Sequence, residues 1–270
     1  MGMKKLYDKF QEKGYCFLRQ FFTNKDINNI RSNIDSDESI NSNELNLKDS
    51  EGYSSTVTVW SGNSSDPVSN VFRYKKLVKI LQVLLNDKVY LYHAKLNRKK
   101  PFGGGSWDWH QDFGYWYLNG CLYPDMLSVY VATSRSTVEN GCIMLLEGSH
   151  KIGRLDHVRI NEQNTIEREL LDVLMNKFKV INCTAEPGDI IIFHSNILHG
   201  SSINKSKYER SGLIGVYNSK HNNPVKKHQY PFYYDMKLLN KSEIFKKNNE
   251  RRKYVSNKTK LANYEVNNNP

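Results

Sequence analysis

Short segments rich in β-branched and aromatic residues follow one another after residue 88 and most constrain how this chain can fold. The pattern predicts six strands, at residues 89–96, 126–132, 142–146, 178–182, 190–193 and 213–217. Turn-forming residues separate them, most clearly at 103–105, 140–141 and 187–189. Short strands joined in this way favour two packed antiparallel sheets.

Helical patterns are gathered in the first 85 residues. Residues 3–13 form a predicted helix that Gly14 ends, and a strand-like segment follows at 15–18. Thr23 and Asp26 have capping-box spacing before apolar residues at helical intervals, and residues 72–85 are again helical. The Ser-, Asn- and Asp-rich residues 35–52 are predicted to be a surface loop. The fold class is therefore α+β, a jelly-roll or cupin-like double-stranded β-helix with supporting N-terminal helices.

The distribution of charge bears on domain organisation and partners. At 270 residues and 39% hydrophobic content, with no internal repeat, the chain is expected to form one domain over residues 1–240. Residues 241–270 are expected to be a basic, Asn-rich, solvated tail. More than half of the formal charge of +11 lies from Lys237 onward, and no nucleic-acid motif accompanies it. We therefore expect no nucleic-acid partner.

Several features predict a cytoplasmic protein that does not bind a membrane. No apolar run approaches the roughly 18 residues that a bilayer span needs, and the start of the chain leads into charged sequence. The four cysteines are scattered, without a CxxC pair, as expected of buried structural thiols in a reducing compartment. The sequence makes no prediction of oligomeric state.

A candidate metal site begins at His110 and Asp112. Side chains two positions apart on an extended segment point to the same face, so both can reach one ion. His199, after the strand at 190–193, can complete a set of two histidines and one carboxylate that leaves positions open on iron(II). A chance His-x-Asp pair and an ordinary core histidine are the alternatives.

Longer segments around these residues carry a family resemblance. They are residues 110–116 (HQDFGYW), 139–142 (ENGC), 148–151 (GSHK), 187–189 (PGD) and 199–201 (HGS), followed by Asn204 and Arg210. In order and spacing they resemble the phytanoyl-CoA dioxygenase-like family of iron(II)- and 2-oxoglutarate-dependent oxygenases, which includes ectoine hydroxylases. The resemblance covers about residues 89–218, which would form the metal-binding core.

The resemblance also implies roles for individual residues. Iron(II) would be held by His110, Asp112 and His199. The distal carboxylate of 2-oxoglutarate would pair with Arg210, whose planar guanidinium suits bidentate contact, beside the hydroxyl of Ser201. Asn97 and Lys95, on one strand face, would lie near the same cosubstrate. For Arg210 the alternative is a surface ion pair, and for Asn97 it is a purely structural role.

The implied reaction is hydroxylation of an unactivated C–H bond in a small molecule, with dioxygen as cosubstrate and ascorbate as a stimulant. Succinate and carbon dioxide would be released. Related halogenases have a small residue in place of the carboxylate, whereas Asp112 is present here. The alternative function is a non-catalytic jelly-roll module that binds or senses the metal or 2-oxoglutarate.

The substrate is predicted less directly. Tyr115, Trp116 and Arg154 are candidate substrate contacts, because segments 115–117 and 153–157 are similar to family members that hydroxylate aminophosphonates or betaine-like compounds. Aromatic rings can attract an ammonium group, and Arg154 would meet an anionic one. Simple packing of the rings and an acyl-CoA substrate are the alternatives. The histidines at 150, 157 and 194 are predicted to be structural or to support the ligands.

Overall fold

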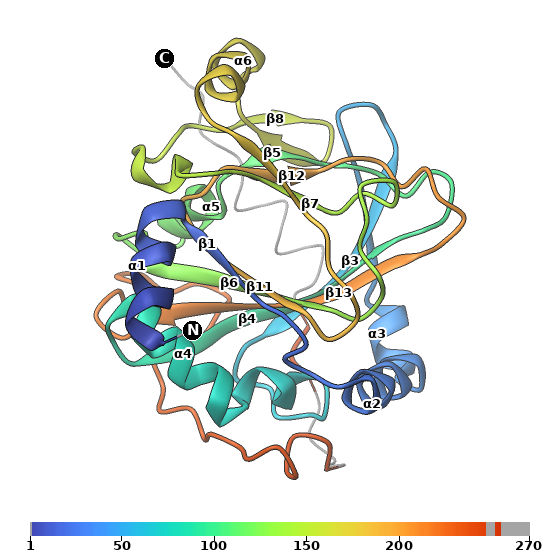
Figure 1. The fold of residues 1–270 in the computed structure, drawn as a ribbon, viewed down its shortest axis with the longest axis vertical. Coiled ribbons are helices and arrows are strands. Elements are labelled where there is room, and N and C mark those ends of the chain that lie inside the picture. The colour runs from blue at the N-terminus through green and yellow to red at the C-terminus, as the bar shows by residue number, and fades with distance from the viewer. Residues whose placement is uncertain (1, 247–251, 255–270) are drawn as a thin grey trace.

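Two facing β-sheets form the centre of the computed structural model, which describes residues 2–246 and 252–254 (Figure 1). The larger sheet has the strand order β1-β11-β6-β13-β4-β3-β2, and the smaller has the order β10-β7-β12-β5. The larger sheet contains β1 (Tyr15–Leu18), β2 (Leu45–Lys48), β3 (Ser54–Ser61), β4 (Val89–Lys99), β6 (Met126–Ala132), β11 (Ile190–His194) and β13 (Arg210–Ser219). The smaller contains β5 (Trp107–His110), β7 (Ile143–Leu146), β10 (Val180–Cys183) and β12 (His199–Ser201). The six strands predicted from the sequence are all present.

The connections bring distant segments together. From β4 to β7 successive strands alternate between the two sheets, and from β10 to β13 they alternate again. All the strand pairs are antiparallel, including β5 with β12. A separate hairpin of β8 (Val158–Ile160) and β9 (Gln163–Thr165) lies above the smaller sheet (Figure 1).

Helices form where the sequence predicts them in the first 85 residues. The helical elements are α1 (Met3–Lys13), α2 (Asn24–Asp35), α3 (Glu38–Ser42), η1 (Ser69–Arg73), α4 (Lys75–Leu85), α5 (Asp112–Leu118), η2 (Ser149–Lys151) and α6 (Arg168–Lys177). Gly14 ends α1 in the left-handed region, with φ of 81°. At the start of α2 the Thr23 hydroxyl accepts from the Asp26 N–H while the Asp26 carboxylate accepts from the Thr23 N–H, so the predicted capping box is confirmed.

The larger sheet is buried on both faces. One face packs against α1, α2 and α4 through a cluster that includes Phe10, Ile30 and Leu81 (Figure 1). The other face meets the smaller sheet through a second cluster that includes Tyr130 and Leu145. The helices thus support one side of a sheet whose other side encloses the candidate site.

The prediction of a surface loop at residues 35–52 is wrong. The segment contains α3, where Ile40 is fully buried, and β2, which pairs with β3. Strand β3 itself was not predicted. Within β2, Leu45 and Leu47 alternate with polar residues and pack toward Val57 and Val59 of β3. The tertiary pairing thus overrides the turn-forming composition.

Part of the predicted solvated tail packs on the domain. Ile244 is fully buried in the same cluster as the N-terminal helices, and Tyr254 forms a β-bridge with Trp60. Arg252 forms ion pairs with Asp37 and Asp66. The rest of the tail prediction falls on residues 247–251 and 255–270, which lie outside the described part of the chain.

All four cysteines are free and buried, as predicted. Within residues 2–246 and 252–254, no helix is both long and apolar enough to cross a bilayer.

Candidate metal centre

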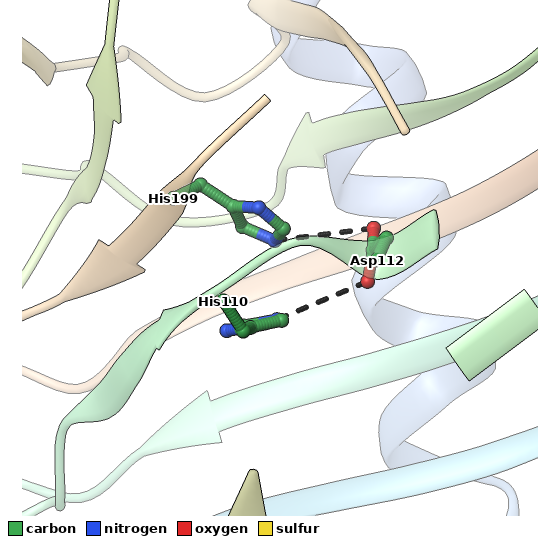
Figure 2. A group of neighbouring side chains, drawn as sticks. All are labelled: His110, Asp112 and His199. Carbon is green, nitrogen blue, oxygen red and sulfur yellow. Dashed lines mark ion pairs between the residues drawn. The ribbon is translucent and has the colours of Figure 1, made fainter. Parts of the chain in front are cut away.

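The three predicted metal ligands come together from two strands and a helix. His110 ends β5, Asp112 begins α5, and His199 begins β12 directly opposite His110 in the strand pairing. Each histidine Nε2 lies 3.9 Å from an Asp112 carboxylate oxygen, as the dashed lines in Figure 2 mark. The three candidate ligand atoms all lie within 4.8 Å of one another, and all three residues are buried. This arrangement can hold one metal ion.

Both imidazoles are oriented in the same way. The Nδ1 atom of His110 lies 2.6 Å from the Asp108 carbonyl oxygen, and that of His199 lies 3.1 Å from the Ile197 carbonyl. When Nδ1 carries the proton and donates it to a carbonyl, Nε2 keeps a free lone pair that can bind a metal. Burial lowers the pKa of both histidines, which keeps the rings neutral as metal binding requires.

The carboxylate of Asp112 is held ionised and oriented. Burial alone would raise its pKa, but the positive charge of Lys95 and the hydrogen bond from Ser128 help to lower the pKa below its usual value. The Ser128 hydroxyl donates a 2.8 Å hydrogen bond to Asp112 Oδ2 from β6. Ser128 was not predicted, because only the sheet topology brings β6 under the metal motif.

Two further polar residues support the ligand segments. Gln111 is fully buried and its side chain bonds the backbone of Gly153, Leu155 and Asn196, which ties the segment between the two ligands to neighbouring loops. The Ser149 hydroxyl accepts from the N–H of Leu198, immediately before His199. The Gly-Ser-His turn at 148–150 therefore supports the segment that carries His199.

A cavity of about 530 Å³ opens above the three ligands and contains the predicted 2-oxoglutarate contacts. Arg210, Ser201, Asn97 and Lys95 all line it. Arg210 is 2% exposed and, among the described residues, forms no ion pair and leaves its Nε without a hydrogen-bond partner. The Ser201 hydroxyl and Asn97 Oδ1 are likewise buried without a partner. The donor groups of Arg210 and Ser201 fit an anionic cosubstrate that would accept from them, whereas Asn97 Oδ1 can only accept from a donor.

The sequence of this chain matches the model of a known protein family. The model described as "Phytanoyl-CoA dioxygenase (PhyH)" matches residues 10–212, about three quarters of the chain. The chain belongs to the phytanoyl-CoA dioxygenase family.

Curated relatives of this family member are hydroxylases of small molecules. An L-proline trans-4-hydroxylase from Streptomyces griseoviridis is 27% identical over 241 residues, which cover 83% of this chain and 89% of the relative. An ectoine dioxygenase from Sphingopyxis alaskensis is 30% identical over 156 residues, which cover 53% of this chain and 51% of the relative. The conservation of enzyme class across these relatives identifies the protein as an iron- and 2-oxoglutarate-dependent dioxygenase.

Solved structures share its fold. EctD from S. alaskensis, solved with 2-oxoglutarate and 5-hydroxyectoine, matches with a TM-score of 0.72 at 21% identity, and the match covers 87% of this chain and 86% of EctD. The same protein with bound iron has a TM-score of 0.73 at 22% identity, with the same coverage.

Two of the three predicted substrate contacts line the cavity, and the third does not. Tyr115 and Trp116 of α5 line the cavity, and the Tyr115 ring meets His110 edge-on at 5.8 Å between centroids. Arg154 does not line it. Its guanidinium pairs with Asp156 and lies over the Tyr117 ring, so the prediction that Arg154 meets the substrate is not supported. Arg159, five residues later on β8, lines the cavity instead.

Of the three remaining histidines of the motif region, His157 contacts residues of the site, whereas His150 and His194 lie against the end of α1. His157 stacks on Tyr115 and its Nε2 accepts from the Gln111 N–H. His150 and His194 lie side by side at 5.3 Å between ring centroids, near the C-terminal end of α1. None of the three belongs to the group of candidate ligand atoms.

Proposed function

We propose that this dioxygenase hydroxylates an unactivated C–H bond of a small molecule, with 2-oxoglutarate converted to succinate and carbon dioxide. In this proposal His110, Asp112 and His199 hold iron(II). The observation that carries it is the convergence of two oriented, neutral imidazoles and one ionised carboxylate at a cavity that also contains an unpaired buried arginine. Such a facial set leaves open positions on the metal.

The same proposal assigns the 2-oxoglutarate site. Arg210 and Ser201 would bind the distal carboxylate, and Asn97 and Lys95 would contact the molecule from β4. Support comes from the burial of Arg210, Ser201 and Asn97 and from Tyr130, whose ring lies 5.1 Å from the Arg210 guanidinium carbon. Ascorbate is proposed as a stimulant of turnover.

Iron(II) with 2-oxoglutarate supplies the activation of dioxygen. The residues of the chain bind the substrate and cosubstrate, orient them and exclude water from the cavity. The two sheets are proposed to form a double-stranded β-helix, in which β5 and β12 present the ligands from a rigid scaffold. The cavity walls, including Trp116 and Phe193, would hold the reacting C–H bond toward the metal and away from bulk water.

The cavity favours a small substrate. A volume of about 530 Å³ lies within the usual range of small-molecule sites, roughly 300–1,000 Å³. Ectoine and L-proline, named for two relatives, are small zwitterions. An aminophosphonate or a betaine-like compound is similar in size, whereas an acyl-CoA would leave much of its nucleotide outside.

A non-catalytic sensor is the second candidate, and the intact ligand set disfavours it. A sensor would bind 2-oxoglutarate saturably without consuming dioxygen. The enzyme should form succinate, and Asp112→Ala should abolish that product because the third ligand is lost.

The first experiment is anaerobic reconstitution with iron(II), followed by 2-oxoglutarate, with measurement of the weak visible charge-transfer absorption of the chelate. We expect the band in the wild type and a weaker one at equal 2-oxoglutarate in Arg210→Ala. Arg210→Lys should restore it only in part, because an ammonium cannot bind in a bidentate way. A wild type without the band would refute the proposed function.

A further inference from the structure

Five cationic side chains line the cavity, and they outnumber the anionic ones. The charged lining residues are Lys95, Asp112, Arg159, Glu162, Arg210, Lys226 and Lys227. In the proposed enzyme the charges of iron(II), Asp112, doubly ionised 2-oxoglutarate and Arg210 cancel. Lys95, Arg159 and the two adjacent lysines then face only Glu162. The excess of positive charge is left for the substrate to balance.

Three of the cationic side chains, those of Arg159, Lys226 and Lys227, are exposed at the opening of the cavity, and they come from two separate segments of the chain. Arg159 lies on β8, whose hairpin partner β9 is fixed to β5 by two bonds of the Gln163 side chain, one from the Asp108 N–H and one to the Ser106 carbonyl. Lys226 and Lys227 lie in the segment that follows β13. Among the described residues, none of the three forms an ion pair.

Arg159 and Tyr115 both line the cavity, and the Tyr115 ring meets the ligand His110 edge-on. A group bound by Arg159 would therefore lie in the same cavity as the three metal ligands.

The segment with the two lysines is anchored beside them. His228 accepts a 2.9 Å hydrogen bond at Nδ1 from the Tyr230 N–H, and its Nε2 lies 3.3 Å from the Tyr92 hydroxyl. The Tyr230 ring stacks on His93 at 4.8 Å between centroids. Further back, the Val225 N–H donates to the Gly120 carbonyl. These contacts fix the backbone on both sides of Lys226 and Lys227.

One buried acceptor in this segment also lacks a partner. Gln229 lines the cavity, and its Oε1 is buried without a hydrogen-bond partner. It can accept from an N–H or O–H of the substrate. The segment therefore offers two cations and one acceptor to a bound molecule.

We infer that the substrate carries an anionic group, of the phosphonate, phosphate or carboxylate type, which Arg159 binds together with Lys226 and Lys227 at the mouth of the cavity. The inference rests on the proposed function, because that function places the reacting C–H bond at the metal. It replaces Arg154 by Arg159 as the arginine of the substrate site, and it makes residues 226–229 a specificity element.

The test measures binding without turnover. Protein loaded with iron(II) and saturating 2-oxoglutarate, kept anaerobic, is titrated in a calorimeter with methylphosphonate, acetate or tetramethylammonium. Saturating 2-oxoglutarate blocks the site at Arg210. The variants are Arg159→Gln and the double variant Lys226→Gln/Lys227→Gln. Arg168→Gln, an exposed arginine on α6 outside the cavity lining, is the matched control.

We expect methylphosphonate to bind the wild type and the control equally, and about tenfold or more weakly to each cavity variant, as the loss of a charged hydrogen bond predicts. The chelate band should persist in all four proteins. Acetate that binds as well as methylphosphonate would assign a carboxylate in place of a phosphonate or phosphate.

Three results would overturn the inference. They are no binding of either anion to the wild type, unchanged affinity in both cavity variants, and binding of tetramethylammonium in preference to both anions. A missing chelate band in the wild type would instead refute the proposed function, and the calorimetry on the same sample would still report whether the anion binds.

Discussion

At the scale of single residues, the candidate site depends on groups that touch a ligand without being ligands. Ser128 donates to Asp112, and backbone carbonyls orient both histidines. Partners of this kind fix the direction of a ligand's lone pair, and their loss commonly costs 10- to 100-fold in metal affinity. None of them is visible in the His-x-Asp motif itself.

Ser128→Ala tests this support. The variant leaves one Asp112 oxygen without its hydrogen bond, so we expect the affinity for iron(II) to fall by about 10- to 100-fold. Anaerobic metal titration, followed by the chelate band, measures it. Ser195→Ala is the control, since that hydroxyl donates to the Pro124 carbonyl and touches none of the three ligands. An unchanged iron affinity in Ser128→Ala would show that Asp112 does not need the serine.

At the scale of elements, one face of β13 lies toward the candidate site, and its other face packs against the core beneath the helices. A side chain at Gly212 would meet the Tyr130 ring, which lies over Arg210, at 2.1 Å. A side chain at Gly215 would meet the Phe72 ring at 2.4 Å, on the face covered by helices. The two glycines allow close approach from opposite sides of one strand.

These glycines give a matched pair of variants. Gly212→Ala should displace Tyr130 and weaken 2-oxoglutarate binding by about tenfold, as expected for a buried cation–π contact worth 1–2 kcal/mol. Gly215→Ala should instead destabilise the fold by about 1–3 kcal/mol through overpacking and leave the affinity for 2-oxoglutarate unchanged. Chelate titration and thermal unfolding separate the two effects. Equal effects of both variants on 2-oxoglutarate would contradict the division of roles.

At the scale of the whole molecule, the end of the described chain is tied to the start of the domain. Arg252 is buried, pairs with Asp37 and Asp66, and lies over the Trp60 ring. Removing one partner of a buried ion pair leaves uncompensated charge, at a cost of about 3–5 kcal/mol. Arg252→Met should therefore lower the free energy of unfolding by that amount in urea, whereas the exposed neighbour Lys253→Ala should change it little. No difference between the two variants would show that the segment does not contribute to stability.

A second link between distant segments depends on pH. His221, after β13, bridges Asp87 and Asp125, with nitrogen–oxygen distances of 2.9 and 2.7 Å. The Asp125 hydrogen bond, with that of Asp87, raises the pKa of His221 in the folded state. A raised folded pKa stabilises the protein below the unfolded value of about 6.5, and this contribution disappears as the pH rises through the folded value.

His221→Asn should therefore lower the Tm at about pH 6, by roughly 2–4 °C at most because the site is half exposed, and should have no effect at about pH 9. Thermal unfolding at both pH values, with the wild type beside it, is the measurement. A difference that persists unchanged at pH 9 would assign the effect to packing instead of charge.

The sequence alone determined the N-terminal helices, six of the later strands and the metal motif. Hydrophobic periodicity and turn residues locate β6 and α4, and capping chemistry locates the start of α2, because these signals are local. The motif around His110 and the later segment from His199 to Arg210 predict the iron and 2-oxoglutarate sites through their family resemblance. The family is confirmed, and the residue roles remain proposals.

Tertiary structure alone decided which side chains share the cavity. Ser128 joins the site because β6 pairs within the larger sheet, and the segment at 226–229 joins it through contacts with Gly120 and Tyr92. Arg154 and Arg159 are five residues apart, yet only the hairpin of β8 and β9 places the second of them at the mouth. No local pattern distinguishes two such arginines, since their positions depend on long-range hydrogen bonds.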